Sequence, residues 1–351
     1  MSRDLYIKAS ASASAGEWVR PSDWLPMPAN ITSADQTFVG LHAVIENSDN
    51  YCSFSFTTSA GQYRVDWGDG NITLHNSGTI AQYQYNYATV SNSTLSSRGY
   101  KQVIIKVTPV SGNLLTCDFQ RRFVTTPAQN RTYSTGFLDC ILSMPNASSI
   151  TFGGTTVRHS YVERFDVKTI GNVTSMSNMF TYCYSLQSVP LFNTQNVTSM
   201  GYMFDSCITL KSVPLFNTQN VTIMVYMFNN CFSLQSVPLF NTQNVTNMGN
   251  MFNTCVSLNF IPNFNTSLVT SFTNFANGCN SLGRCTTIFR NSVGLQSCQL
   301  SKDALVEVFT NLIDRTSTTS ATIDITGNWG ATALTSADRL IATGKNWTIT
   351  G

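Results

Sequence analysis

The sequence predicts a mainly β protein, in which an immunoglobulin-like sandwich precedes a solenoid of stacked coils and an α/β cap follows. Three observations predict this fold: a repeat of constant period, a run of short alternating strands before it, and an amphipathic helix after it. The expected boundaries follow these changes of pattern. They are an extended arm over 1–35, a sandwich over 36–110, a linker and N-terminal cap over 111–171, a solenoid over 172–282 and a C-terminal cap over 283–351.

The repeat consists of residue columns that recur at a constant interval. Its unit reads Asn-Val-Thr-x-Met-x-x-Met-Phe-x-x-Cys-x-x-Leu-x-x-Val-Pro-x-Phe-Asn-Thr-x. The cysteine column is Cys183, Cys207, Cys231, Cys255 and Cys279. This interval lies within the period of about 20 to 29 residues that is typical of leucine-rich-repeat coils with apolar columns. Because one coil cannot bury its own apolar edge, we expect about five coils to stack around a continuous core.

The repeat unit also resembles a known family. The phrase Met-Phe-x-x-Cys-x-x-Leu-x-x-Val-Pro-x-Phe-Asn-Thr-x-Asn-Val-Thr is similar to the BspA-type, or DUF285-type, leucine-rich-repeat surface proteins, and the resemblance covers the expected solenoid over 172–282. Such proteins occur on bacterial and mycoplasma surfaces and among bacteriophage structural proteins. No apolar stretch of signal-peptide length follows Arg3, which favours the phage setting. We therefore expect synthesis in a host cytoplasm, with reduced cysteines, and a virion as the destination.

Short strands with alternating polarity predict the sandwich. The runs HAVIE, SFSFTT, QYRVDWGDG, AQYQYNYA and KQVIIKVTPV lie between Phe38 and Val110, a spacing typical of a seven-stranded antiparallel sandwich. The phrase VDWGDG, the Tyr-rich strand and the closing VIIKVTP together resemble a PKD-type immunoglobulin-like domain. Asp66 and Asp69 are candidate calcium ligands, although formation of the tight Asp-Gly turn is the favoured interpretation.

The N-terminal arm contains candidate anchors for a partner. Tyr6, Trp18 and Trp24 surround a run of alternating Ala and Ser residues, and such a segment has too little apolar content to fold alone. A neighbouring subunit or a second protein is the expected partner. The arm has a weak resemblance to short segments of phage tail and fibre proteins.

Two caps are expected to cover the ends of the solenoid. FLDCIL and SSITF, within 111–171, read as irregular first coils, since terminal repeats are usually atypical. After the repeats, Ser301 is the expected N-cap of an amphipathic helix, the run ATIDITGN a last strand, and 335–343 a second short helix. The final residues resemble the C-terminal cap of phage proteins with such repeats, which would cover an open strand edge.

The composition argues against an enzyme and against charged partners. Charged residues make up 11% of the chain, against about 25% in an ordinary domain, and the net charge is +2. Between Met176 and Leu282 the charged side chains are Asp205 and Lys211, which excludes the carboxylate pair of a glycosidase. We therefore predict no catalytic residues, no metal and no cofactor. Without clustered Lys and Arg or a long apolar run, we also expect neither nucleic-acid binding nor membrane insertion.

The cysteine column has two interpretations. Metal sites need ligands at short spacing, such as Cys-x-x-Cys, and the repeat has none. A small buried thiol that fills a narrow corner of each coil explains the column without further assumptions.

A neutral face of amide, hydroxyl and aromatic groups remains as a candidate for recognition. Its candidate residues are Tyr202, Tyr226, Asn196, Asn220 and Asn244. Such groups both donate and accept hydrogen bonds, which suits sugar hydroxyls. The alternative is that they only satisfy the turns of the coils. The Asn-Val-Thr triplets also match the N-glycosylation pattern, but we interpret them as turn residues.

These observations favour a non-enzymatic bacteriophage structural protein. The arm and sandwich would dock to capsid or tail proteins in many copies or as a homo-oligomer, and the solenoid would face a host surface or its glycans. Head decoration and a tail-fibre role both stay open. The alternative is a bacterial cell-surface leucine-rich-repeat adhesin. A glycan-degrading depolymerase is a third hypothesis, which the scarcity of charge disfavours.

Overall fold

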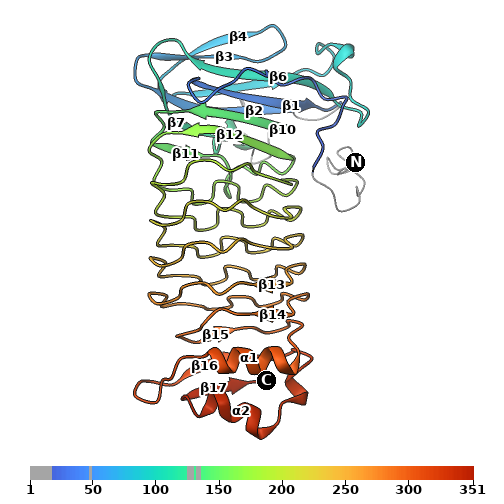
Figure 1. Cartoon of the computed structure of the whole chain (residues 1–351). Helices are drawn as coiled ribbons and strands as arrows, with labels where there is room; N and C mark the ends of the chain where they lie inside the picture. The colour runs from blue at the N-terminus through green and yellow to red at the C-terminus, as the bar shows by residue number, and fades with distance from the viewer. Residues whose placement is uncertain (1–17, 47–49, 125–129, 132–135) are drawn as a thin grey trace. The chain divides into compact units, whose positions relative to one another are not determined.

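The computed structural model describes residues 18–46, 50–124, 130–131 and 136–351. The chain is mainly β, with few helices and a β-solenoid of about eight turns (Figure 1). It divides into two compact units. The first unit comprises Met1–Val173 and Tyr182–Phe192, and the second comprises Thr174–Thr181 and Asn193–Gly351.

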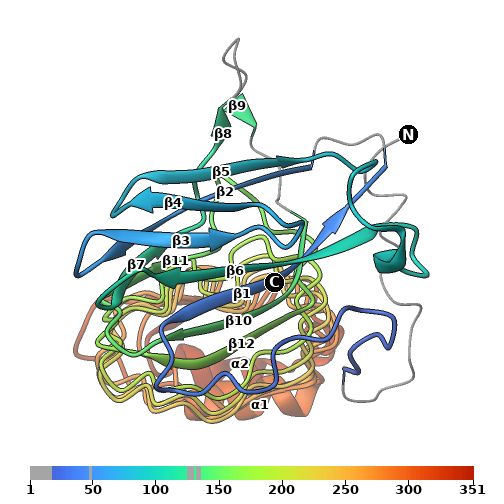
Figure 2. The same cartoon turned by 90° about the horizontal axis from the view of Figure 1, so that it is seen from above.

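The larger sheet of the first unit has the strand order β12-β10-β1-β6-β3-β4. Its strands are β1 (Thr37–Val44), β3 (Gln62–Asp66), β4 (Ile72–Asn76), β6 (Lys101–Pro109), β10 (Phe137–Met144) and β12 (Arg164–Ile170). Neighbours are antiparallel except for the parallel pair β10 and β12. Figure 2 shows β1, β6, β10 and β12 side by side. Every residue of β1 and β10 is buried, so these two neighbouring strands form the most buried part of the sheet.

A second sheet packs against the first. Its order is β11-β7-β2-β5, with β2 (Asn50–Thr58), β5 (Ile80–Tyr85), β7 (Leu114–Asp118) and β11 (Ser149–Thr151). Phe38 of β1 and Phe56 of β2 have ring centroids 6.3 Å apart, and the ring of Phe119 lies 4.7 Å from that of Phe38. The core between the sheets is therefore rich in aromatic residues. A two-stranded hairpin, β8 (Phe123–Val124) and β9 (Asn130–Arg131), completes the strands of this unit.

Residues 111–171 were expected to form a linker and the first coils. Their strands β7, β10, β11 and β12 enter the two sheets. The pairs β10–β12 and β7–β11 are parallel, as between stacked coils, and Arg164 at the start of β12 forms a parallel bridge with Ser188. The run FLDCIL lies in β10, where every residue is buried. A continuous apolar run suits a central sheet strand as well as a coil, so the pattern alone could not distinguish the two.

Successive coils of the second unit are joined by single parallel bridges. These are Ser175↔Ser199, Ser199↔Ile223, Ile223↔Asn247, Asn247↔Ser271 and Phe272↔Val293. The apolar columns of the repeat point inward. The rings of Phe180, Phe204, Phe228 and Phe252 form a ladder with centroid separations of 5.5, 5.6 and 5.7 Å. Residues one repeat unit apart in the sequence thus become neighbours in space.

The stacking continues through the C-terminal part of the second unit. Its strands are β13 (Phe260–Ile261), β14 (Arg284–Cys285), β15 (Val293–Gly294), β16 (Ala321–Asp324) and β17 (Trp347–Thr350). Parallel pairs join β13 to β14, β15 to β16, and β16 to β17. We expected about five coils and one strand after the repeats. The stack is longer because parallel backbone pairing does not require the repeat's side-chain columns.

Both helices begin where the capping signals place them. Helix α1 (Lys302–Asn311) follows the N-cap Ser301, whose hydroxyl accepts a hydrogen bond from the N–H of Ala304. Helix α2 (Ser336–Thr343) begins with a capping box formed by Thr335 and Asp338. Among the described residues, short 3-10 helices span Asn92–Thr94 and Ala331–Ala333.

Candidate functional site

Two tyrosines form a stacked pair on the surface of the second unit. The rings of Tyr202 and Tyr226 have centroids 4.7 Å apart and planes inclined by 9°, and both residues are partly exposed. The N–H of Tyr202 donates to the carbonyl oxygen of Val225, and that of Tyr226 to the carbonyl oxygen of Gly249, at 2.9 Å each. Because these bonds join neighbouring coils, the backbone ladder itself sets the spacing of the rings.

The backbone of both tyrosines is in the left-handed region. Their φ angles are 59° and 55°. The same column holds Asn178, Asn250 and Asn274, with φ of 62°, 55° and 49°. Asn tolerates this conformation, whereas a bulky residue is uncommon there and pays roughly 1–2 kcal/mol. The two tyrosines therefore depart from the residue that the coil prefers, and such strain concentrates at functional sites.

A polar ladder lies three positions further along the same coils. The Nδ2 of Asn229 donates to Oδ1 of Asp205 at 2.7 Å, and Nδ2 of Asn253 donates to Oδ1 of Asn229 at 2.8 Å. The hydroxyl of Ser206 also donates to Oδ1 of Asp205. In the described part of the chain, both side-chain bonds to this carboxylate therefore end on the same oxygen.

Asp205 is a nearly buried carboxyl beside the tyrosine pair. The residue is 7% exposed, and its N–H donates to the carbonyl oxygen of Tyr202 at 3.1 Å. Burial raises the pKa of the Asp205 carboxyl above its ordinary value, and the bonds from Asn229 and Ser206 oppose that rise. Aromatic faces, a carboxyl group and amides therefore lie within one stretch of two adjacent coils.

The predicted asparagines have a different role from the tyrosines. The Nδ2 of Asn220 donates to the carbonyl oxygen of Gln195, and that of Asn244 to the carbonyl oxygen of Gln219, at 2.7 Å each. These bonds join the turns of neighbouring coils. The structure thus brings Tyr202 and Tyr226 together, and it gives Asn220 and Asn244 the turn role that the sequence had left open.

Asn196, at the equivalent position of an earlier coil, is partly exposed. Sequence reasoning missed the Asp205 ladder, because Asp205 was considered only as one of two charges. The column that contains Asp205, Asn229 and Asn253 recurs once in each repeat unit and could have revealed the ladder.

The cysteine column lies inside the coils. Cys183, Cys207, Cys231, Cys255 and Cys279 are all buried, and none of them forms a disulfide. The Sγ atoms of the last four donate to the carbonyl oxygens of Phe180, Phe204, Phe228 and Phe252, at 3.0–3.1 Å. Burial raises the pKa of these thiols where a shift is resolved, which disfavours the reactive thiolate.

Neither a metal cluster nor a membrane span was found within the described ranges. No three His, Cys, Asp or Glu side chains lie close enough to hold a metal ion, and no helix is long and apolar enough to cross a membrane. Asp66 and Asp69 form the turn after β3. Oδ1 of Asp66 accepts from the N–H of Gly68, and Oδ1 of Asp69 accepts from the N–H of Asn71, at 3.1 Å each.

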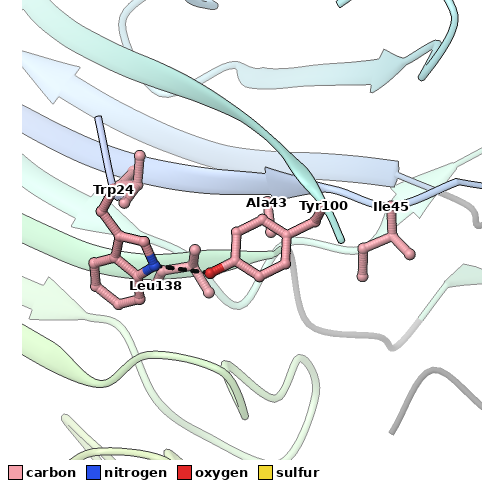
Figure 3. Close-up of a cluster of buried hydrophobic side chains, with 6 residues drawn as sticks. Trp24, Ala43, Ile45, Tyr100 and Leu138 are labelled. Atoms are coloured by element: carbon pink, nitrogen blue, oxygen red, sulfur yellow. Dashed lines mark hydrogen bonds between the residues drawn. The ribbon is translucent and has the colours of Figure 1, made fainter. Parts of the chain in front are cut away.

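The candidate docking arm is described only from Trp18 onward, so Tyr6 lies outside the described residues. Trp24 is 4% exposed, and its Nε1 donates to the hydroxyl of Tyr100 at 2.8 Å (Figure 3). Nε1 of Trp18 donates to Oε2 of Glu163 at 3.2 Å. The cluster around Trp24 contains Leu41, Ala43, Ile45, Tyr100 and Leu138. Both indoles are therefore engaged within the first unit.

Comparison with known families gives a match over the repeat region. Residues 147–259 and 231–284 match the family described as "Mycoplasma protein of unknown function, DUF285". Residues 147–284 are similar to DUF285 repeats. This match supports the BspA-like resemblance of the coils and extends upstream of the expected solenoid. Comparisons with curated proteins and with solved structures gave no match.

Proposed function

We propose that this chain is a non-enzymatic recognition protein whose solenoid binds an uncharged glycan at Tyr202 and Tyr226. The observation that supports this proposal is the stacked, partly exposed tyrosine pair at positions where neighbouring coils have Asn. Aromatic faces pack against the C–H face of a sugar ring. The two side-chain bonds of the ladder to Asp205 end on Oδ1, so Oδ2 is the atom that would accept a hydrogen bond from a sugar hydroxyl at the edge of such a ring.

The scarcity of charge supports a neutral ligand. Asp205 and Lys211 are the charged residues between Met176 and Leu282, and Asp205 is nearly buried. A surface without clustered charge attracts neither an anionic nor a cationic polymer. Contacts with hydroxyl and C–H groups remain as the source of affinity.

The number of carboxyl groups in the solenoid supports binding without hydrolysis. Glycoside hydrolysis ordinarily uses two carboxyl groups about 5–10 Å apart, on opposite sides of the scissile bond. Asp205 is the one carboxyl residue between Met176 and Leu282. A sugar held by this stretch of the solenoid therefore has no second acid or base from the same coils.

A bacteriophage particle is the setting that we propose for this activity. The N-terminal unit, as a PKD-type immunoglobulin-like sandwich with its arm, would dock to capsid or tail proteins in many copies, and the solenoid would be presented to the host. The VDWGDG turn, the buried Trp67 and the two packed sheets support the PKD-type assignment. The resemblance of the C-terminal residues to phage caps supports the virion.

Mass spectrometry and labelled imaging of purified particles test this setting. Head decoration and tail-fibre roles predict different locations on the particle, and absence of the chain from particles would refute both. The alternative is a bacterial cell-surface adhesin, and the observation that supports it is the match to the mycoplasma family. It predicts that the chain is found in the surface fraction of its native cell.

The glycan proposal is tested with a variant built from the repeat's own residues. Tyr202→Asn and Tyr226→Asn together install the residue found at Asn178 and Asn250, so the coils keep a side chain that suits their backbone. Binding to a panel of neutral polysaccharides is measured by calorimetry. We expect the double variant to lose at least about tenfold in affinity, or about 1.4 kcal/mol, because both aromatic faces that would contact the sugar ring are removed.

Leu239→Asn provides a matched control. Leu239 is 59% exposed on the same solenoid, so its replacement changes an apolar surface residue without touching the tyrosine pair. The control is expected to bind like the unaltered protein, and circular dichroism checks the fold of both variants. Unchanged affinity of the double variant, or no binding of any neutral polysaccharide by the unaltered chain, would overturn the proposal.

A further inference from the structure

Strand β4 forms one edge of the six-stranded sheet of the first unit. Its inner side pairs with β3 in a regular antiparallel register, from Asp66↔Ile72 to Gln62↔Asn76. Beyond the ends of this ladder, the N–H of Trp67 donates to the carbonyl oxygen of Asn71 at 3.0 Å, and that of Ser77 donates to the carbonyl oxygen of Gly61 at 2.8 Å.

These two bonds fix the direction of every backbone group in β4. Hydrogen-bonded pairs alternate along an antiparallel ladder. Since Asn71 and Ser77 bond toward β3, so do Thr73 and His75. The N–H and carbonyl groups of the intervening residues therefore point away from the sheet. These residues are Ile72, Leu74 and Asn76.

The outward side of β4 lacks three common protections of a sheet edge. Edge strands are commonly protected by Lys, Pro or a bulge. The strand reads Ile-Thr-Leu-His-Asn, without Pro or a charged carboxylate, Lys or Arg, and its register with β3 has no shift. Ile72 is 52% exposed and Leu74 is 56% exposed. The carbonyl oxygen of Asn76 accepts from the N–H and the hydroxyl of Thr79, at 3.0 and 2.7 Å. The outward groups left for a partner strand are therefore those of Ile72 and Leu74 and the N–H of Asn76, and they occur together with apolar side chains on one short strand.

We propose that β4 pairs with β4 of a second copy of this chain, antiparallel and related by a two-fold axis at Leu74. In this register Leu74 faces Leu74 of the second copy, Ile72 faces Asn76, and Thr73 faces His75. The N–H and carbonyl groups of the two Leu74 residues then bond each other, and the N–H of each Asn76 donates to the carbonyl oxygen of the opposing Ile72. Ile72 also lies diagonally across from the opposing Leu74, within the reach of large side chains. The exposed apolar residues of both strands would form one continuous group.

The charges around the strand favour a second copy as the occupant. Two-fold pairing places like residues opposite each other, so a Lys or Glu at its centre would repel itself, and β4 has neither. The nearest charges on the neighbouring strand β3 are Arg64 and Asp66, whose side chains lie 3.7 Å apart and offset each other. The charges around the outward edge of β4 are therefore compatible with the same edge of a second copy.

The contact would be weak and would depend on concentration. A strand of five residues buries less than the roughly 1,200 Å² of a stable protein interface. Such pairing is consistent with copies brought together at high local concentration, where many weak contacts act jointly. This inference concerns the first unit and is independent of the glycan site.

A complementary pair of charged variants tests the two-fold register. Sedimentation velocity of the full chain, up to its solubility limit, measures the fraction of dimer. Leu74→Lys and Leu74→Glu each place like charges opposite one another, and we expect at least about a tenfold loss of association for each alone. An equimolar mixture places Lys opposite Glu and should recover dimer. Leu95→Lys, at a position 53% exposed outside β4, should associate like the unaltered chain.

Three outcomes would overturn the proposal. The first is an unaltered chain that stays monomeric at every concentration. The second is a Leu74→Lys variant that dimerises like the unaltered chain, and the third is a mixture that shows no recovery. Circular dichroism and thermal melting confirm that each variant is folded before its association is compared. The Tyr202 and Tyr226 variant should dimerise normally, which separates this result from that of the glycan proposal.

Discussion

Phe228 lies at the centre of the aromatic ladder of the solenoid, and its replacement tests how the coils hold together. Its side chain is fully buried. Its ring lies 5.6 Å from that of Phe204 and 5.7 Å from that of Phe252, and each pair of ring planes is inclined by 2°. Its ring also stacks with that of Phe240, with centroids 6.3 Å apart. Phe228→Ala therefore opens a cavity between two coils and removes three ring contacts at once.

We expect this substitution to lower the free energy of unfolding by about 5 kcal/mol. Replacing a core Phe by Ala costs about 3–5 kcal/mol, and each ring pair contributes about 0.5–1.5 kcal/mol beyond its buried area. The expected loss lies near the upper end of the range for a core Phe, because the rigid backbone ladder on both sides limits collapse of the cavity. The N–H of Phe228, for example, donates to the carbonyl oxygen of Met251 at 2.9 Å.

Guanidinium unfolding followed by circular dichroism measures this change. In a solenoid each coil is stabilised by its neighbours, so the variant should also unfold with a shallower transition than the unaltered chain. Phe232→Ala, at a position 41% exposed shortly after Phe228 in the chain, is the matched control and should change stability by no more than about 0.5 kcal/mol. A loss below about 1 kcal/mol for Phe228→Ala, or a loss equal to that of the control, would refute the reasoning.

Two further predictions concern the first unit. Burial lowers the pKa of His159 from 6.5 to about 4, so the neutral form is favoured in the folded state. About 3 kcal/mol of the free energy of unfolding, present above pH 6.5, should therefore disappear as the pH falls to about 4. Urea unfolding at several pH values measures how steeply the free energy of unfolding changes with pH. This dependence should be weaker in His159→Gln, and an unchanged dependence would contradict the prediction. Gly68 has a φ of +79°, and an added Cβ would lie 2.4 Å from the carbonyl oxygen of Ile104, whereas Gly70 has a φ of +95° and open space around it. Thermal melts should therefore show that Gly68→Ala lowers the free energy of unfolding by at least about 3 kcal/mol, whereas Gly70→Ala lowers it by about 1 kcal/mol. Equal losses in the two variants would argue against the close contact between Gly68 and Ile104.

The coils and helix starts could be predicted from the sequence because their causes are local or periodic. A column such as Cys207 and Cys231 recurs once in each repeat unit, and stacked coils place equivalent residues next to each other. The same period predicted that Tyr202 and Tyr226 would be neighbours. Ser301 and Thr335 cap their helices through hydroxyl groups that act within one turn, so no distant contact was needed to predict them.

The sheets required the tertiary structure because a strand's partner can lie anywhere along the chain. The run over 137–142 is compatible with a coil or a sheet strand, and only the structure shows that it pairs antiparallel with β1 on one side and parallel with β12 on the other. The free edge of β4 depends equally on which strands occupy the other positions.

The candidate site shows the same division on a smaller scale. The period alone placed the tyrosines in adjacent coils, but their left-handed backbone follows from the path of each coil between its bridges. The burial of Asp205 beside them, bonded to Asn229, depends on side-chain packing within the stack. The sequence by itself thus determined which residues repeat, and the tertiary structure decided which of them are strained, buried or exposed, because those properties depend on the surrounding coils.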